Sequence, residues 1–136
     1  MSPDVLYLIL CDEIQTDPSN YHRCNVLGLI TSIRSAVAPP FPIEHPRMLA
    51  LIVWTGGKGT GELALRVIPD RLGKTVFRSR PRQVRFVGDA AAVGGVVFRI
   101  QNCPFPAAGL YWVEVLFAGS VIARQRLILR DSGELP

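Results

Sequence analysis

The segment Gly109–Arg130, GLYWVEVLFAGSVIARQRLILR, decides the fold. Apolar side chains recur at every second position in both of its halves, and arginines fall on the opposite positions near its end. The residues predicted to face inward are Tyr111, Val113, Val115, Phe117, Val121, Ala123, Leu127 and Leu129. This alternation is typical of strands with one buried face, and the Ala-Gly-Ser sequence between the halves favours a tight turn. The segment therefore predicts a β-hairpin that packs on a hydrophobic core.

The rest of the chain repeats this pattern, and helical periodicity is nearly absent. Further strands are predicted at residues 5–11, 25–33, 48–54, 61–68 and 95–102, with a shorter one at 74–79. The expected core residues on two of these strands are Leu63, Leu65, Val67, Val96, Phe98 and Ile100. Seven or eight short strands separated by turn sequences predict an all-β, two-sheet sandwich with mostly antiparallel strands.

Length and composition indicate one globular domain. The chain has 136 residues, which is a common size for a domain that folds around its own core. We expect one β-sandwich domain over residues 1–136, with a frayed tail at 131–136. Apolar residues make up 49% of the chain, and charged residues only 19%. The low charge suggests that part of the apolar surface is covered by a partner.

The longest apolar run, Val5–Cys11, is too short for a membrane-spanning helix, which needs about 20 residues. It also lacks the preceding basic residues and the small-residue cleavage site of a signal peptide. We therefore expect a cytoplasmic protein without a membrane partner. The cysteines, Cys11, Cys24 and Cys103, are odd in number and widely spaced, so they are predicted to be buried free thiols.

A glycine-rich stretch, WTGGKGTGELALRV at residues 54–67, invites comparison with phosphate-binding loops. Such loops place a lysine at the end of the motif and a helix after it, because the helix N-terminus attracts the anion. Here Lys58 comes too early, and the following residues alternate like a strand. The stretch is predicted to be a hairpin loop whose glycines adopt positive φ. A weak anion site at Lys58 is the alternative.

Two longer motifs carry a resemblance. In CDEIQTDPSNYHRCNVLGLITSIRS, a strand ends in Cys-Asp and is followed by Asn-x-x-Gly with an apolar tail; PPFPIEHPR then supplies a Phe-Pro pair. Later, FPAAGLYWVEVLFAGSVIARQRLIL combines Phe-Pro-x-x-Gly-x-Tyr with a second glycine and apolar positions. Together these motifs resemble a family of small bacterial proteins of unknown function, over about Leu6 to Leu129. The resemblance implies an immunoglobulin-like β-sandwich and brings no catalytic residues.

Candidate chemical residues are sparse. His22 and Cys24 would share one face of a strand, and with His45 or Asp17 they could form a Cys–His dyad or a metal site. No spacing of a known catalytic or metal motif supports this hypothesis. Three carboxylates between the first two strands lack a second acidic loop that would complete a calcium site. We expect no catalytic residue, no metal and no cofactor.

The richest basic stretch is FRSRPRQVRF, which contains Arg78, Arg80, Arg82 and Arg85. Arg78 and Arg80 are expected to share a strand face, and a proline then shifts the register. The stretch predicts an edge strand, where charge and proline block unwanted pairing. Alternatively, it forms a basic strip for a nucleic acid, another polyanion or an acidic protein partner. No exposed aromatic residues are interleaved to stack on bases.

Some apolar residues fall on positions that should face outward. Leu110, Trp112 and Leu116 lie opposite the core set of their strand, so either a loop of the chain or another chain covers them. Trp112 with nearby arginines is typical of an interface hot spot. We therefore expect a non-catalytic interaction or structural module that binds a protein partner, with a homodimer as one form. Binding of nucleic acid or another polyanion through the arginine-rich strand is the alternative hypothesis.

Overall fold

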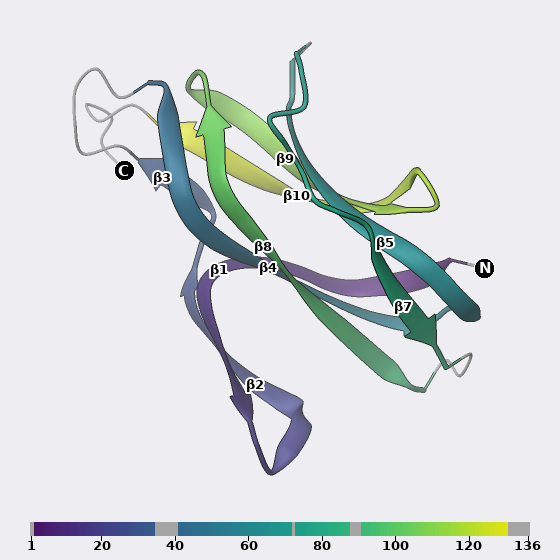
Figure 1. The fold of residues 1–136 in the computed structure, drawn as a ribbon. Coiled ribbons are helices and arrows are strands. Elements are labelled where there is room, and N and C mark those ends of the chain that lie inside the picture. Colours follow the sequence, from purple (N-terminus) through teal and green to yellow (C-terminus); the bar gives the residue numbers. More distant parts are fainter. Residues whose placement is uncertain (1, 35–40, 72, 88–90, 131–136) are drawn as a thin grey trace.

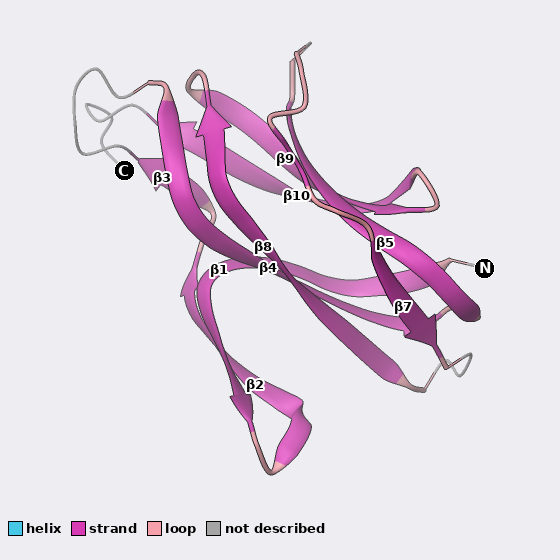
Figure 2. Cartoon of the chain, viewed as in Figure 1, coloured by secondary structure: helices cyan, strands magenta, loops and turns pink. Residues whose placement is uncertain are grey.

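The computed structural model describes residues 2–34, 41–71, 73–87 and 91–130. Every regular element in these ranges is a strand (Figures 1 and 2). The strands are β1 (Pro3–Asp17), β2 (Asn20–Leu29), β3 (Ser32–Arg34), β4 (Ile43–Gly56), β5 (Gly59–Pro69), β6 (Phe77–Arg78), β7 (Arg82–Phe86), β8 (Val93–Phe105), β9 (Gly109–Phe117) and β10 (Ser120–Arg130). No helix that could cross a membrane occurs in the described part of the chain. The predicted frayed tail, 131–136, lies outside the described residues.

Two sheets form the sandwich that the sequence predicts. The four-stranded sheet has the order β2-β1-β4-β8. The six-stranded sheet has the order β3-β10-β9-β5-β6, and β7 also pairs with β5. Strand pairing is antiparallel except between β3 and β10, which run parallel. Because β6 and β7 pair with different parts of β5, they follow one another along the same edge of the six-stranded sheet.

The core between the sheets consists of the residues that alternation selects. Leu63, Leu65 and Val67 of β5 are fully buried. From the opposite sheet, β8 contributes the buried residues Val96, Phe98 and Ile100. Tyr111, Val113 and Val115 are buried as predicted, and the partly buried Phe117 packs against the same core. Leu127 and Leu129 close it from β10.

One inward assignment is wrong. Val121 is 42% exposed, although Ala123, two residues later, packs against the core. The register between β9 and β10 shifts between these two residues. A β-bulge inserts an extra residue and thereby moves the preceding side chains to the other face. Simple counting of every second position cannot anticipate that shift.

The strand boundaries also differ from the predicted ones. The expected strand at 25–33 divides into β2 and β3, which belong to different sheets. The expected strand at 74–79 shrinks to the two residues of β6. The edge strand predicted for the arginine-rich stretch is confirmed, but it is divided into β6 and β7, which both pair with β5 at the edge of the six-stranded sheet. Strand β7 is the longer of the two. Its anchor is the buried Phe86, whose ring makes edge contacts with Trp54 and Phe117.

The glycine-rich loop connects the two sheets. Gly56, Gly57 and Gly59 have positive φ, as expected, and strand β5 follows instead of a helix. However, β4 and β5 lie in different sheets, so the loop is an inter-sheet connection and not the predicted hairpin. A side chain at Gly57 would meet the ring of Phe86 at 2.7 Å, which leaves room only for glycine.

The connection between β8 and β9 carries a feature typical of immunoglobulin-like sandwiches. The Tyr111 hydroxyl donates a hydrogen bond to the backbone carbonyl of Ala107, four residues upstream, over 2.8 Å. This is the geometry of a tyrosine corner. The ring of Tyr111 also packs edge-on against Phe105, with centroids 5.0 Å apart. These contacts fix the end of β8, the strand that borders the site described below.

The β1–β2 hairpin extends beyond the sandwich (Figure 1). Strand β1 pairs with β4 up to Cys11 and from there with β2 up to Asp17. At the hairpin turn, the Asp17 side chain accepts hydrogen bonds from the backbone N–H and the hydroxyl of Ser19. The aspartate therefore stabilises the turn.

Candidate functional site

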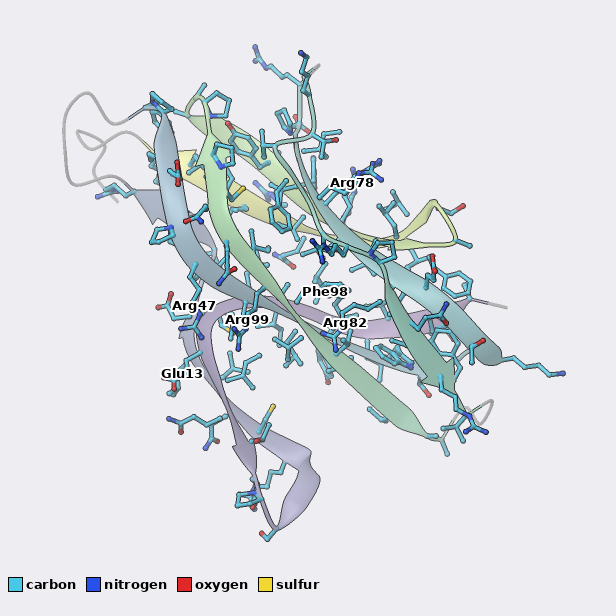
Figure 3. The ribbon with its side chains drawn as sticks, in the orientation of Figure 1. Glu13, Arg47, Arg78, Arg82, Phe98 and Arg99 are labelled. Carbon is cyan, nitrogen blue, oxygen red and sulfur yellow. The ribbon has the colours of Figure 1, made fainter. Side chains whose placement is uncertain are left out.

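The arginine-rich stretch is divided between two faces of the six-stranded sheet. Arg78 lies opposite Arg66 in register, and Arg85 lies opposite Thr60, so both project from the outer face. Arg82 lies opposite the buried Leu63 and projects from the inner face. In Figure 3, Arg78 is set apart from Arg82. The stretch is therefore not one continuous strip.

Arg80 lies between β6 and β7. Because β6 ends at Arg78, the strand face that Arg78 and Arg80 were expected to share does not form. Ser79 holds this connection against β5: its backbone N–H donates to the Leu65 carbonyl at 2.8 Å, and its hydroxyl accepts from the Leu65 N–H at 2.9 Å. The exposed Arg80 thus follows directly on an anchored residue.

A groove runs between this edge of the six-stranded sheet and β8 of the four-stranded sheet. Its volume is about 600 Å³. We call it the edge groove; its lining residues are Phe77, Arg78, Ser79, Arg80, Arg82, Val97, Phe98, Arg99, Gln101 and Asn102. Four of these residues are arginines, and none of the described lining residues carries a carboxylate. The groove is therefore strongly basic.

Arg82 bridges the two sheets inside the edge groove. Its Nη1 atom donates a hydrogen bond to the backbone carbonyl of Val97 over 2.7 Å. Its guanidinium carbon lies 5.6 Å from the ring centroid of Phe98, within cation–π range. Phe98 is only 3% exposed, so the arginine caps a core residue at the open side of the sandwich. Figure 3 shows Arg82 and Phe98 side by side.

The open side of β8 presents free backbone groups to the edge groove. Within the described ranges, β8 pairs with β4 on one side and with no strand on the other. The Val97 carbonyl that binds Arg82 must face this open side. In an antiparallel ladder, residues whose N–H and C=O both point away from the neighbour alternate with residues whose groups both point toward it. The backbone groups of Arg99 and Gln101 therefore also face the open side.

The basic character continues onto the outer face of the four-stranded sheet. Arg99 lies opposite Leu49, and Arg47 lies opposite Gln101, so the two arginines are diagonal neighbours on that face. Figure 3 shows both on the side of β8 away from Phe98, with Glu13 below them. Sequence reasoning placed Arg99 outward but missed its part in the groove, because strand order is not encoded locally.

The outer face around Trp112 is occupied by contacts within the chain. The Trp112 indole N–H donates to the Asp70 carboxylate over 2.7 Å, and the guanidinium carbon of Arg124 lies 4.0 Å from the indole ring. Leu116 is only 5% exposed and Leu110 is half-buried. The apolar patch predicted from these residues is therefore largely covered by neighbouring side chains of the same sheet.

An ion pair lies in the centre of that face and was not anticipated. Glu114 is 7% exposed, and its Oε1 atom is 2.7 Å from Nε of Arg66 on the adjacent strand. The register places Arg66 and Arg124 on either side of Glu114. Alternation places Arg66 and Glu114 on outward positions of their strands, but only the pairing of β5 with β9 brings them together.

The thiols are not all buried. Cys11 and Cys103 are buried as predicted, but Cys24 is exposed because it lies on β2 of the projecting hairpin. Burial raises the pKa of Cys103 to about 12, so this thiol stays protonated. The side chain of His22 lies outside the described residues. In the part of the chain that the structure describes, no three His, Cys, Asp or Glu side chains gather as metal ligands would.

Three solved structures with low sequence identity are similar to this chain. An immunoglobulin-like protein from Pseudomonas aeruginosa is 12% identical, with a TM-score of 0.37, over 91% of this chain and 97% of its own. The alkylpurine DNA glycosylase AlkC of Pseudomonas fluorescens, bound to DNA containing an abasic site analog, is 12% identical with a TM-score of 0.47. The beta-D-glucoside glucohydrolase of Trichoderma reesei is also 12% identical, with a TM-score of 0.47.

The match to each of the two enzymes covers a small part of the enzyme. It covers 74% of this chain and 27% of the glycosylase, and 95% of this chain and 19% of the hydrolase. Similarity at this level supports no conclusion about the function of this chain. No curated protein sequence matches the chain. One sequence family does match, over residues 6–130, which confirms the resemblance that the motifs indicated over nearly the same span. The chain belongs to the family of unknown function DUF6941, and its fold is an all-β, two-sheet sandwich with a tyrosine corner.

Proposed function

We propose that this protein is a non-catalytic interaction module that binds a protein partner in the edge groove. The observation that carries the proposal is the groove itself: about 600 Å³ of space, four arginines, and a strand edge that no described strand covers. Exposed strand edges are sites where another chain pairs, unless the fold blocks them. Positive charge without a carboxylate among the groove's described lining residues adds selectivity for an acidic surface.

The Trp112 face supports the proposal less well. Its aromatic ring and indole N–H are engaged by Arg124 and Asp70, and Leu116 is buried. An interface hot spot needs a side chain that is accessible in the free protein and becomes buried against the partner. The partner site is therefore assigned to the groove, and the Trp112 face is assigned to stabilisation of the sheet.

Binding of a nucleic acid or another polyanion is the second candidate, and the four groove arginines favour it. Two features weigh against it. Phe98 is buried and Phe77 is half-buried, so neither offers a ring on which a base stacks. In addition, Arg82 already donates to a backbone carbonyl and is partly committed to the fold.

Capture of the partner by cross-linking tests the proposal. The purified chain is compared with the double variant Arg80→Glu/Arg99→Glu, which reverses two exposed groove charges. Arg85→Glu is the matched control, because Arg85 comes from the same stretch but is not among the residues that line the groove. We expect a specific protein to be captured by the wild type and by Arg85→Glu and lost with the double variant. Equal capture by all three chains would contradict the proposal.

A further inference from the structure

The open strand edge of β8 inside the groove indicates which kind of protein segment binds there. We propose that a short, extended, acidic segment of the partner adds to the four-stranded sheet as a strand beside β8. This inference rests on the proposed function and names the class of ligand. Strand addition supplies affinity through main-chain hydrogen bonds and specificity through alternate side chains.

The free backbone of β8 defines where the segment would pair. The N–H and C=O groups of Arg99 and Gln101 face the open side. The run is bounded at one end by Val97, whose carbonyl is held by Arg82. At the other end, Asn102 has a φ of 53°, outside the range of a strand. These bounds favour a short contact that is centred on Arg99 and Gln101.

The positive charge of the groove determines which side chains the bound segment carries. Arg99 lies on the outer face of the four-stranded sheet, while Arg80 and Arg82 line the opposite wall of the groove. A strand between these walls projects alternate side chains toward each of them. Carboxylates at such positions reach arginines that have no carboxylate among the groove's described residues. A second copy of this chain fits less well, because its net charge is +4.

The backbone of a nucleic acid has no N–H group to donate to the β8 carbonyls, and this difference provides the test. The probe is a peptide of about ten residues, the upper end of usual strand lengths, in which pairs of glutamates alternate with pairs of threonines, so that both faces of the strand carry carboxylates. A matched peptide carries a methyl group on every backbone nitrogen, so it keeps the charge and loses every N–H donor. A single-stranded oligonucleotide of similar charge is the third ligand. Binding is measured by fluorescence anisotropy at near-physiological salt, and amide hydrogen exchange is followed in the complex.

We expect the unmodified peptide to bind and to slow hydrogen exchange at the Arg99 and Gln101 amides. The methylated peptide should bind at least about tenfold more weakly, and so should the unmodified peptide to Arg80→Gln/Arg99→Gln. Arg85→Gln should leave binding unchanged. Circular dichroism of each variant checks that loss of binding does not reflect loss of folding.

Three results would overturn the inference. They are failure of the unmodified peptide to bind, equal binding of the methylated peptide, and tighter binding of the oligonucleotide with loss of binding on the same arginine substitutions. If any of these occurs while the captured partner still depends on Arg80 and Arg99, strand addition is wrong and the proposed function stands. If the partner is also captured by the double glutamate variant, the proposed function fails as well.

Discussion

Arginine side chains occupy two regions of this molecule with opposite surroundings. On the outer face of the six-stranded sheet, Arg66 pairs with the buried Glu114, and Arg124 stacks on Trp112. In the edge groove, four arginines line one space, and none of the described residues that line it is acidic. The comparison suggests that arginines with partners inside the chain stabilise the sandwich, whereas Arg80 and Arg99 are available to a ligand.

The largest expected effect on the free energy of unfolding comes from Cys103, which is buried on β8, the same strand whose open edge borders the groove. Burial raises the pKa of Cys103 from 9.0 to about 12. In the unfolded chain the thiol loses its proton near pH 9, but in the folded chain it keeps the proton to about pH 12. The free energy of unfolding should therefore fall as pH rises through this range, by up to about 4 kcal/mol.

Urea denaturation at a series of alkaline pH values measures this slope. Cys103→Ala should reduce it, because the substitution removes one titrating group; burial also raises the pKa of Cys11 and of Tyr111, so part of the slope remains. Cys24→Ala, at the exposed cysteine of the hairpin, should leave the slope unchanged. An identical slope in the wild type and Cys103→Ala would show that another group controls the alkaline loss of stability.

The second-largest expected effect on the free energy of unfolding comes from the Arg66–Glu114 ion pair of the six-stranded sheet. Glu114→Ala leaves Arg66 without its carboxylate on a partly buried face. Complete burial would make such a loss cost 3–5 kcal/mol, and the partial exposure of Arg66 reduces the expected cost to about 2 kcal/mol. Urea denaturation measures the change, and the double variant Arg66→Ala/Glu114→Ala should recover part of it. A change below ~0.5 kcal/mol would break the contrast between the two regions.

Arg82 belongs to both groups of arginines, because it lines the groove and also contacts the core. Arg82→Ala removes its hydrogen bond to the Val97 carbonyl and its contact with Phe98. We expect a loss of about 1 kcal/mol in the free energy of unfolding, because the arginine is exposed. The matched substitution Arg85→Ala should change the free energy by less than ~0.5 kcal/mol. Equal effects of the two substitutions would show that the bridge across the sheets has no energetic role.

The sequence predicts much of the core, because side-chain direction in a strand depends only on position along the chain. Leu63, Leu65 and Val67 follow that rule and are fully buried. The rule fails at Val121, where a bulge shifts the register, and in the arginine-rich stretch, where the predicted edge strand is divided into β6 and β7. Local deviations of this kind depend on the neighbouring strand, which the local pattern does not contain.

The site is less predictable, because it depends on strand order. Trp112 contacts an aspartate 42 residues away, so its outward position indicates nothing about whether it is free. Three arginines of the predicted arginine-rich stretch line the edge groove, but the members of the stretch are divided between two faces. Arg99 joins the groove only because β8 is the last strand of its sheet.

The most direct test of the central claim measures stability and binding on the same variant. For Arg80→Glu/Arg99→Glu, the free energy of unfolding by urea and the capture of the partner are determined together. We predict a change of less than ~0.5 kcal/mol in stability, as for exposed substitutions, together with loss of capture. Unchanged capture, or a loss of stability comparable to that of Glu114→Ala, would contradict the claim that the groove arginines are available to a ligand and do not stabilise the fold.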